Sequence, residues 1–324
     1  MASAVMNEEQ PVQQKVFVRG DPNNPGESVE KGFPRALRGD AYPTIDHGSG
    51  RMELARWLTN PAHPLTPRVM VNRIWQWHFG EGLVRSPSNW GAVGERPTHP
   101  DLLDFLASRF VEGGWSIKAM HRLILLSSTY QMSSHADREA REKDPGNRLV
   151  SRFNRRRLTV EEIRDGFLAI DGSLDRTVGG PLPAGGDSPE ESRRRTVYLP
   201  VRRGGMPVML SMFDFGDATA SSEARSRTNV APQALFMMNS EFAATRALGV
   251  AKLLLEDTAL SDQERVDRAY TLTLARPADA REVARAREYL GGLEAKLGSQ
   301  GARLAAWQSF CRLLLSSNEF VYLD

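Results

Sequence analysis

Apolar residues recur at intervals of three or four over most of the chain after residue 50. This spacing predicts amphipathic helices whose apolar faces form a core. Only two short segments, KVFVRG near the N-terminus and TVYLPVRR at 196–203, have a composition typical of strands. The predicted helices are 50–59, 67–79, 100–112, 117–132, 160–171, 232–256, 262–275, 280–297 and 302–315.

Several predicted helices have recognisable ends. Thr66 and Pro67 supply a capping hydroxyl and a proline at the first helical position. In a capping box, the side chains at two positions three residues apart each satisfy the other's free amide. This spacing occurs at Thr159 and Glu162, Ser261 and Glu264, and Asp279 and Glu282, while Gly80 and Gly113-Gly114 indicate helix stops.

The expected fold class is mainly α: a multi-helix globular domain with a small β element. Because a lone strand leaves its backbone groups without partners, the two strands should pair with each other or with a third segment. The favoured prediction pairs the N-terminal strand, about residues 15–19, with 196–203. The whole chain, 1–324, is predicted to be a single domain. Its parts are an extended N-terminal segment (1–50), a first helical part (51–171), an exposed flexible loop rich in Gly and Pro (172–195), and a strand followed by a second helical part (196–324).

The helix at 67–79 is unusual because polar groups lie among large apolar ones. At about 100° per residue, its apolar side chains cover an arc of roughly 200°, so the helix is predicted to be mostly buried. Two polar residues, Arg68 and His78, fall within this arc and need partners, which the loop residues Ser86, Ser88 and Asn89 or a tryptophan ring could supply. The apolar side chains are Met70, Val71, Ile74, Trp75, Trp77 and Phe79.

The polar residues of these helices have two interpretations. Asn72, Arg73 and Gln76 share the remaining arc of 67–79, and form either a solvated edge or a structural hydrogen-bonding set. In 117–132, His121 points away from the polar stripe; it is either a satisfied core histidine or a functional one. If His78, His121 and Arg68 converge on a cleft, they are the candidate catalytic residues of a hydrolase.

Composition narrows the possible functions. The net charge is +2, and all but six of the 42 basic residues are arginine. Arginine suits bidentate recognition of carboxylate, phosphate or sulfate, although a GC-rich genome gives the same bias. We expect ligand-binding candidates at Arg68, Asn72, Arg73, Gln76 and Asn89. If the two strands pair, Arg202 and Arg203 join Arg19 in an anion-attracting patch.

Other chemistry lacks support in the sequence. A single cysteine, Cys311, allows neither a disulfide nor a pair for haem attachment, and the six histidines lack metal-binding spacing, so no metal and no cofactor are predicted in this chain. Nucleic-acid motifs are missing, so DNA or RNA binding is not predicted. The first fifteen residues do not resemble a signal peptide, and no membrane span is predicted.

Motifs covering most of the chain carry a family resemblance. They include NPAHPLTPRVMVNRIWQWHFGEGLVRSPSNWG, NRLVSRFNRRRLTVEEIRDGFLAI, TVYLPVRRGGMPVMLSMFDFGD and APQALFMMNSEF. In this order they resemble the C-terminal domain of unknown function number 1553, a planctomycete-specific domain of planctomycete and verrucomicrobial cytochrome-c-type multidomain proteins. After FDFGD the chain departs from the usual pattern, so the loop around 217–228 is expected to differ in shape.

The resemblance implies a type of parent protein and a cellular location, but no reaction. It implies a C-terminal module of an exported multidomain protein, extracytoplasmic (periplasmic or at the cell surface), with haem only in upstream domains. The favoured prediction is a non-catalytic ligand-binding or assembly module, with anionic polysaccharide as a candidate ligand. The alternatives are the hydrolase and a structural cap for the upstream cytochrome-c-like domains. The cap hypothesis predicts an exposed apolar surface near the N-terminus.

Overall fold

The computed structural model describes residues 14–34, 37, 45, 48–135, 137–180, 191–201, 205–216 and 222–323. These residues are mostly helical, as predicted. Contacts within the chain divide it into two compact units, 1–153 and 154–324, which are described separately below. Their boundary lies inside the predicted first helical part, 51–171. That the chain unfolds as a single domain stays a prediction.

Unit 1 begins with a hairpin and a short helix. Strand β1 (Lys15–Phe17) pairs antiparallel with β2 (Pro25–Ser28), and a 3-10 turn, η1 (Val18–Gly20), lies between them. Helix α1 (Arg51–Leu58) follows. The expected pairing of the N-terminal strand with 196–203 is therefore wrong, since residues 196–198 form a 3-10 helix instead. A partner about ten residues away closes a far shorter loop, at a smaller entropic cost.

Three helices form the core of unit 1: α2 (Thr66–Phe79), α3 (Pro100–Glu112) and α4 (Ile117–Leu125). Helix α4 ends seven residues before the predicted stop, because the Ser127 hydroxyl donates to the carbonyl of Ile124 at 2.6 Å and the chain then turns. Helix α5 (Arg138–Lys143) follows. The core residues are Val71, Ile74, Trp75, Phe79, Leu83, Val84, Leu103, Leu106, Ala107, Phe110, Met120, Ile124 and Phe153.

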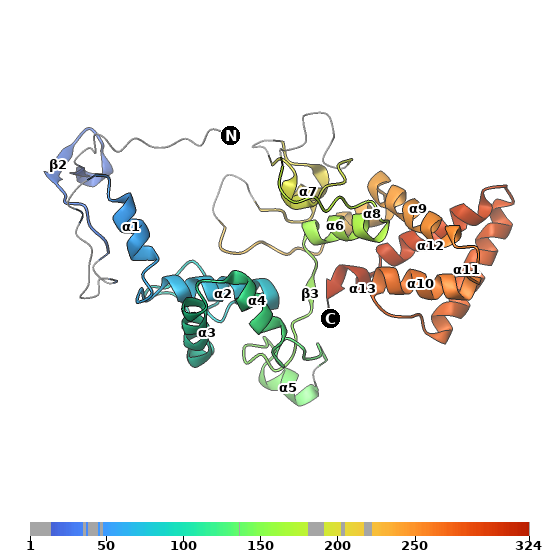
Figure 1. The fold of residues 1–324 in the computed structure, drawn as a ribbon, viewed down its shortest axis with the longest axis horizontal. Helices are drawn as coiled ribbons and strands as arrows, with labels where there is room; N and C mark the ends of the chain where they lie inside the picture. The colour runs from blue at the N-terminus through green and yellow to red at the C-terminus, as the bar shows by residue number, and fades with distance from the viewer. Residues whose placement is uncertain are drawn as a thin grey trace. The chain divides into compact units, whose positions relative to one another are not determined.

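Unit 2 is a larger helical assembly closed by a short strand pair, β3 (Arg156–Arg157) with β4 (Tyr322–Leu323). At its centre α12 (Ala302–Leu315) packs along α9 (Glu241–Glu256) (Figure 1). The fully buried Trp307 and Cys311 of α12 join one core with Val250 and Leu254 of α9. Its helices are α6 (Val160–Ile170), η3 (Thr196–Tyr198), α7 (Val208–Met212), α8 (Ala231–Asn239), α9 (Glu241–Glu256), α10 (Asp262–Leu274), α11 (Ala280–Leu297), α12 (Ala302–Leu315) and α13 (Asn318–Val321).

The capping patterns predicted from the sequence are present in unit 2. All three predicted capping boxes are present, at the starts of α6, α10 and α11. The predicted helix 232–256 is interrupted at Ser240, whose side chain accepts from the amide of Ala243 at 3.2 Å and so caps α9. Cys311 is buried as expected, and burial raises the pKa of its thiol to about 12.

Candidate functional site

Helices α2 and α4 bring two of the predicted site residues into direct contact. Nε2 of His78 lies 2.8 Å from Nδ1 of His121, a hydrogen-bonding distance, and the rings are nearly perpendicular. The ring of Tyr130 packs edge-on against His78, with centroids 5.6 Å apart. Both imidazoles are partly buried. Among the sequence candidates that the structure describes, these two histidines lie within hydrogen-bonding distance of each other, and the function of the pair stays a prediction.

Arg68 does not join the two histidines through any contact the structure shows. Its Nε donates to Oδ1 of Asp104 on α3 at 2.7 Å, and its Nη1 donates to the carbonyl of Pro64 at 2.6 Å. The hydrogen bond from Arg68 lowers the pKa of Asp104. The Arg68 side chain is 35% exposed, so it is only partly removed from water. A carboxylate from a neighbouring helix replaces the loop and indole partners that the sequence suggested.

Asn72 has the structural role that the sequence left open. It is fully buried; its Nδ2 donates to the carbonyl of Val84 at 2.9 Å, and its Oδ1 accepts from the amide of Val84 at 2.8 Å. Asn72 therefore hydrogen-bonds both backbone groups of Val84, as a neighbouring β-strand would, and holds the loop that follows α2 in place. A Cβ on Gly82 would lie 2.6 Å from Asn72 Nδ2, so a glycine is needed for this close approach.

The other candidates on α2 lie toward solvent. Arg73 is exposed and Gln76 is partly buried. Trp77, which the helical wheel placed in the buried arc, is 55% exposed, so that part of the prediction is wrong. The apolar arc is narrower than predicted because α3 and α4 cover only part of the circumference of α2.

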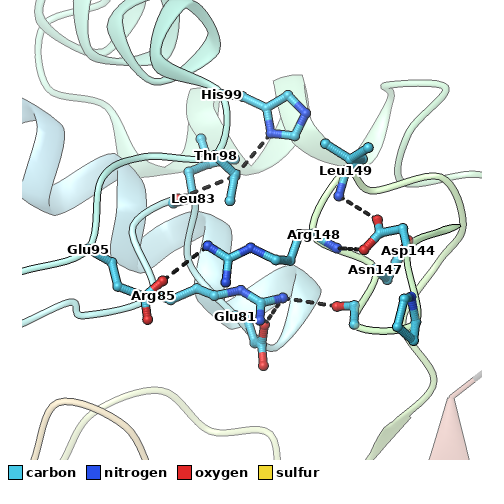
Figure 2. Close-up of polar contacts among 12 residues, drawn as sticks. Glu81, Leu83, Arg85, Glu95, Thr98, His99, Asp144, Asn147, Arg148 and Leu149 are labelled. Atoms are coloured by element: carbon cyan, nitrogen blue, oxygen red, sulfur yellow. Dashed lines mark hydrogen bonds and ion pairs between the residues drawn. The ribbon is translucent and has the colours of Figure 1, made fainter.

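The loops 81–99 and 144–149 are joined by polar contacts (Figure 2). Arg85 pairs with Glu81 at 2.5 Å and donates to the carbonyl of Gly146, while Arg148 pairs with Glu95 at 3.2 Å. Each guanidinium therefore faces a glutamate, and the cluster is close to neutral. Asn89 is exposed, and its Oδ1 accepts from the amide of Gly91 within the same loop. These contacts shape the loops and leave little net charge for an anionic ligand.

His63 is a residue whose structural part was not foreseen from the sequence. Its ring is buried, and Nδ1 accepts hydrogen bonds from the amides of Leu65 and Thr66 at 3.1 and 3.0 Å. It therefore caps α2 in place of the predicted Thr66 hydroxyl, which itself lies 3.0 Å from the same nitrogen. Burial lowers the pKa of His63. Histidine is a rare capping residue, so the sequence pattern did not identify it.

This cap predicts a stability that depends on pH. Well above pH 6.5 His63 is neutral in both states, whereas around and below pH 6.5 the unfolded chain takes up a proton that the folded chain resists. The free energy of unfolding should therefore fall as the pH drops from about 6.5 toward the lower folded-state pKa. Urea unfolding of the wild type and of His63→Asn, between pH 5 and 7.5, should show a weaker dependence in the variant. His135→Asn, at an exposed position, is the control. If the free energy of unfolding of His63→Asn depended on pH as strongly as that of the wild type, the assignment would be contradicted.

A shallow hollow of about 710 Å³ lies on the outer face of α4. Lys118 and Arg122 reach into it beside the exposed side chains of Leu123 and Leu126, and neither cation forms an ion pair with a carboxylate of the described residues. The hollow is lined by Ser116, Lys118, Ala119, Arg122, Leu123, Leu126 and Ser127. No candidate catalytic residue is among them, so the hollow is not the histidine-lined cleft of the hydrolase hypothesis.

In unit 2, buried arginines tie distant segments together. Arg157 donates to Asp214 at 2.8 Å and to Gln233 at 2.5 Å, and also to the carbonyl of Thr228. Burial would raise the pKa of Asp214, but hydrogen bonds from Thr228 and Arg157 outweigh it and hold this pKa below its ordinary value. Asp214 has a φ of 60°, so this network holds an unfavourable backbone conformation in place.

Arg164 organises the flanks of the predicted exposed loop 172–195. Its guanidinium is buried and donates to the carbonyls of Ser192 and Arg194 and to the Thr196 hydroxyl. Ser192 is itself buried, so this flank of the loop is held against the unit rather than exposed. The middle of the loop, 181–190, lies outside the described residues, as do Arg202 and Arg203.

Three further arginines act in the same structural way. Arg246 pairs with Asp171 at 2.8 Å, and Arg265 donates to the carbonyls of Leu254 and Asp257 at the end of α9. Arg276 bridges two glutamates, and its hydrogen bonds lower the pKa of Glu282 to about 2. Much of the arginine excess therefore serves internal contacts, which weakens the argument from composition for an anion-binding surface.

Comparison with known proteins places the chain in a family. A family model described as "PSD1: Protein of unknown function (DUF1553)" matches residues 50–290. The chain belongs to this PSD1 family. The match includes the whole of α2 and α4, and so both histidines of the pair. No curated protein and no solved structure matches the chain.

The structure adds two observations that bear on the PSD1 chain's chemistry. Among the residues that the structure describes, no three His, Cys, Asp or Glu side chains are grouped so as to hold a metal ion. None of the helices in the described part of the chain has the length and apolar character that a membrane crossing requires.

Proposed function

We propose that this PSD1 chain is a non-catalytic assembly module that docks onto another domain through its N-terminal segment. The observation that carries the proposal is the exposure of this segment. Strands β1 and β2 and helix α1 contain no buried residue. Trp57 of α1 is partly buried against the rings of Phe33 and His63. Seven other large apolar side chains between residues 16 and 58 are at least 40% exposed: Val16, Phe17, Val18, Val29, Met52, Leu54 and Leu58.

Such a segment gains little stability within the chain alone. A two-stranded hairpin and an eight-residue helix are each marginal in water without an apolar face to cover. On α1, Leu54 and Leu58 lie one turn apart and form a short apolar stripe. A partner surface that buries these side chains would stabilise the segment and remove its exposed apolar area from water.

The partner that fits the family resemblance is a cytochrome-c-like domain upstream in an exported parent protein. In this proposal the module is extracytoplasmic, and haem is held by the upstream domain. The exposed apolar surface near the N-terminus is the feature that the structural-cap hypothesis requires, so this observation favours the cap among the hypotheses raised by the sequence.

Hydrogen exchange tests the assembly proposal. The amides of residues 14–34 and 51–58 should exchange at least tenfold more slowly in the proposed parent protein, with its upstream cytochrome-c-like domain, than in this chain alone. Replacing Leu54 and Leu58 with serine should remove that protection, because the stripe loses its apolar contacts. Leu297→Ser, at an exposed position of α11, is the matched control. Equal exchange in the two proteins would rule out docking through this segment.

A second candidate function is binding of an anionic polysaccharide in the hollow on α4. Lys118 and Arg122 favour it, because they form no ion pair among the described residues and two cations beside apolar surface suit a sulfated or carboxylated sugar. Lys118→Gln with Arg122→Gln should weaken binding to heparin about tenfold or more, whereas Arg141→Gln on exposed α5 should not change it. Binding that neither prefers heparin over neutral dextran nor weakens with added salt would exclude this function.

A further inference from the structure

The contact between His78 and His121 holds a single proton. A hydrogen bond between two imidazole nitrogens 2.8 Å apart needs one nitrogen to carry a proton and the other to offer a lone pair. One added proton is tolerated, because it can go to the far nitrogen of the donor ring. A second must go to the accepting nitrogen, which places two N–H groups head to head and two cations in contact.

The surroundings of the pair oppose that second proton. The other charged side chains of α2 and α4 are all cations, and the ring that packs on His78 is that of Tyr130. Helix α3 packs against both helices and carries three carboxylates, of which Asp104 is paired with Arg68 and Glu112 with Arg109. The third, Asp101, is exposed at the start of α3. The cations are Arg68 and Arg73 on α2 and Lys118 and Arg122 on α4.

Part of the hollow lies on the side of α4 away from the pair. At about 100° per residue, His121 points about 160° away from Ala119 and Leu123 of the hollow, but only about 60° from Lys118 and about 100° from Arg122. It lies instead beside the buried side chains of Met120 and Ile124, which pack in the core of unit 1. A movement of α4 away from α2 would therefore shift Lys118 and Arg122 together with the helix.

We propose that His78 and His121 form a pH-sensitive latch between α2 and α4, closed at neutral pH and opened when both rings are protonated. Opening is expected on acidification, because two imidazolium rings in contact have no lone pair left for the hydrogen bond between them. Opening loosens α4 and reshapes the hollow behind it. The latch stands on the geometry of the pair alone; only its effect on ligand binding rests on the polysaccharide-binding function proposed above.

Hydrogen exchange of the full chain, without ligand, tests the latch. After correction for intrinsic rates, the amides of 117–125 should exchange at least tenfold faster at pH 5 than at pH 7. His121→Gln should abolish this response, because a neutral amide cannot take up the second proton. His135→Gln, at an exposed position, should retain it. Any effect of His63 is read separately, at the amides of Leu65 and Thr66 that it caps.

A titration of the wild-type imidazoles by ¹⁵N NMR keeps the test decisive if a variant fails to fold. The two rings should take up their protons in two separated steps, the second coinciding with faster exchange in α4. Two independent, overlapping titrations would overturn the proposal, and so would unchanged exchange of 117–125 between pH 7 and pH 5. If the latch works but heparin binding does not change with pH, the latch stands and the hollow is not the ligand site.

Discussion

Arg157→Met is expected to lower the free energy of unfolding by about 3–5 kcal/mol. The Arg157 side chain is 8% exposed and is the common donor to Asp214, Gln233 and the carbonyl of Thr228. Methionine fills a similar volume but leaves a carboxylate and two further acceptors without their donor. Urea unfolding followed by circular dichroism measures the loss, and the α6–α8 region should show the earliest loss of exchange protection.

An exposed ion pair supplies the contrast for this experiment. Arg138 and Glu142 on α5 form an ion pair at 2.7 Å, but both side chains are largely solvated. Arg138→Met should therefore change the free energy of unfolding by no more than about 0.5 kcal/mol. Arg157→Lys should recover only part of the loss, because an ammonium cannot reach the partners of a guanidinium fork. A loss below about 1 kcal/mol in Arg157→Met would show that the network is dispensable.

Asn72→Ala is expected to destabilise unit 1 by about 2–4 kcal/mol. The substitution leaves both the amide and the carbonyl of the buried Val84 without a partner, and each such group costs about 1–3 kcal/mol. Because Val84 lies in the core between α2 and the following loop, the loop 81–99 should lose exchange protection first. Chemical denaturation with tryptophan fluorescence measures the change.

Asn89 is the matched control, since it was an equal candidate for ligand binding. Its Oδ1 accepts one hydrogen bond within an exposed turn, so Asn89→Ala should cost no more than about 1 kcal/mol. If Asn72→Ala proved as mild as Asn89→Ala, water would have to satisfy Val84 in its place. If Asn72→Ala kept its stability but lost a ligand, the binding role considered from the sequence would be restored.

The helices of this chain were largely predictable, because their signals are local. The periodicity of apolar residues located nine helical segments, and the three capping boxes predicted from spacing alone are all present. Such signals depend on residues three or four apart, which meet on one helix face whatever surrounds it. The errors at 117–132 and 232–256 arose where serine side chains bond to the local backbone and interrupt an otherwise continuous pattern.

The candidate site was predictable only in part. Placing His78 and His121 on the inner faces of two helices was within reach of a helical wheel, and the structure brings the two together at 2.8 Å. The partner of Arg68 could not be predicted, because Asp104 lies 36 residues away in the sequence and contacts Arg68 only when α3 packs on α2. His63 was missed for a similar reason: its role as a cap depends on burial of its ring and the geometry of the preceding turn.

The sequence by itself determined the helical class, the helix starts and the burial of apolar stripes, since these follow from backbone hydrogen bonding and side-chain spacing within one segment. Only the tertiary structure decided which strand pairs with β1, which arginines form ion pairs with carboxylates inside the protein, and which side of α4 is exposed to solvent. Those outcomes depend on which distant groups meet. A hydrogen bond or ion pair between residues far apart in the sequence produces no periodic pattern from which it could be predicted.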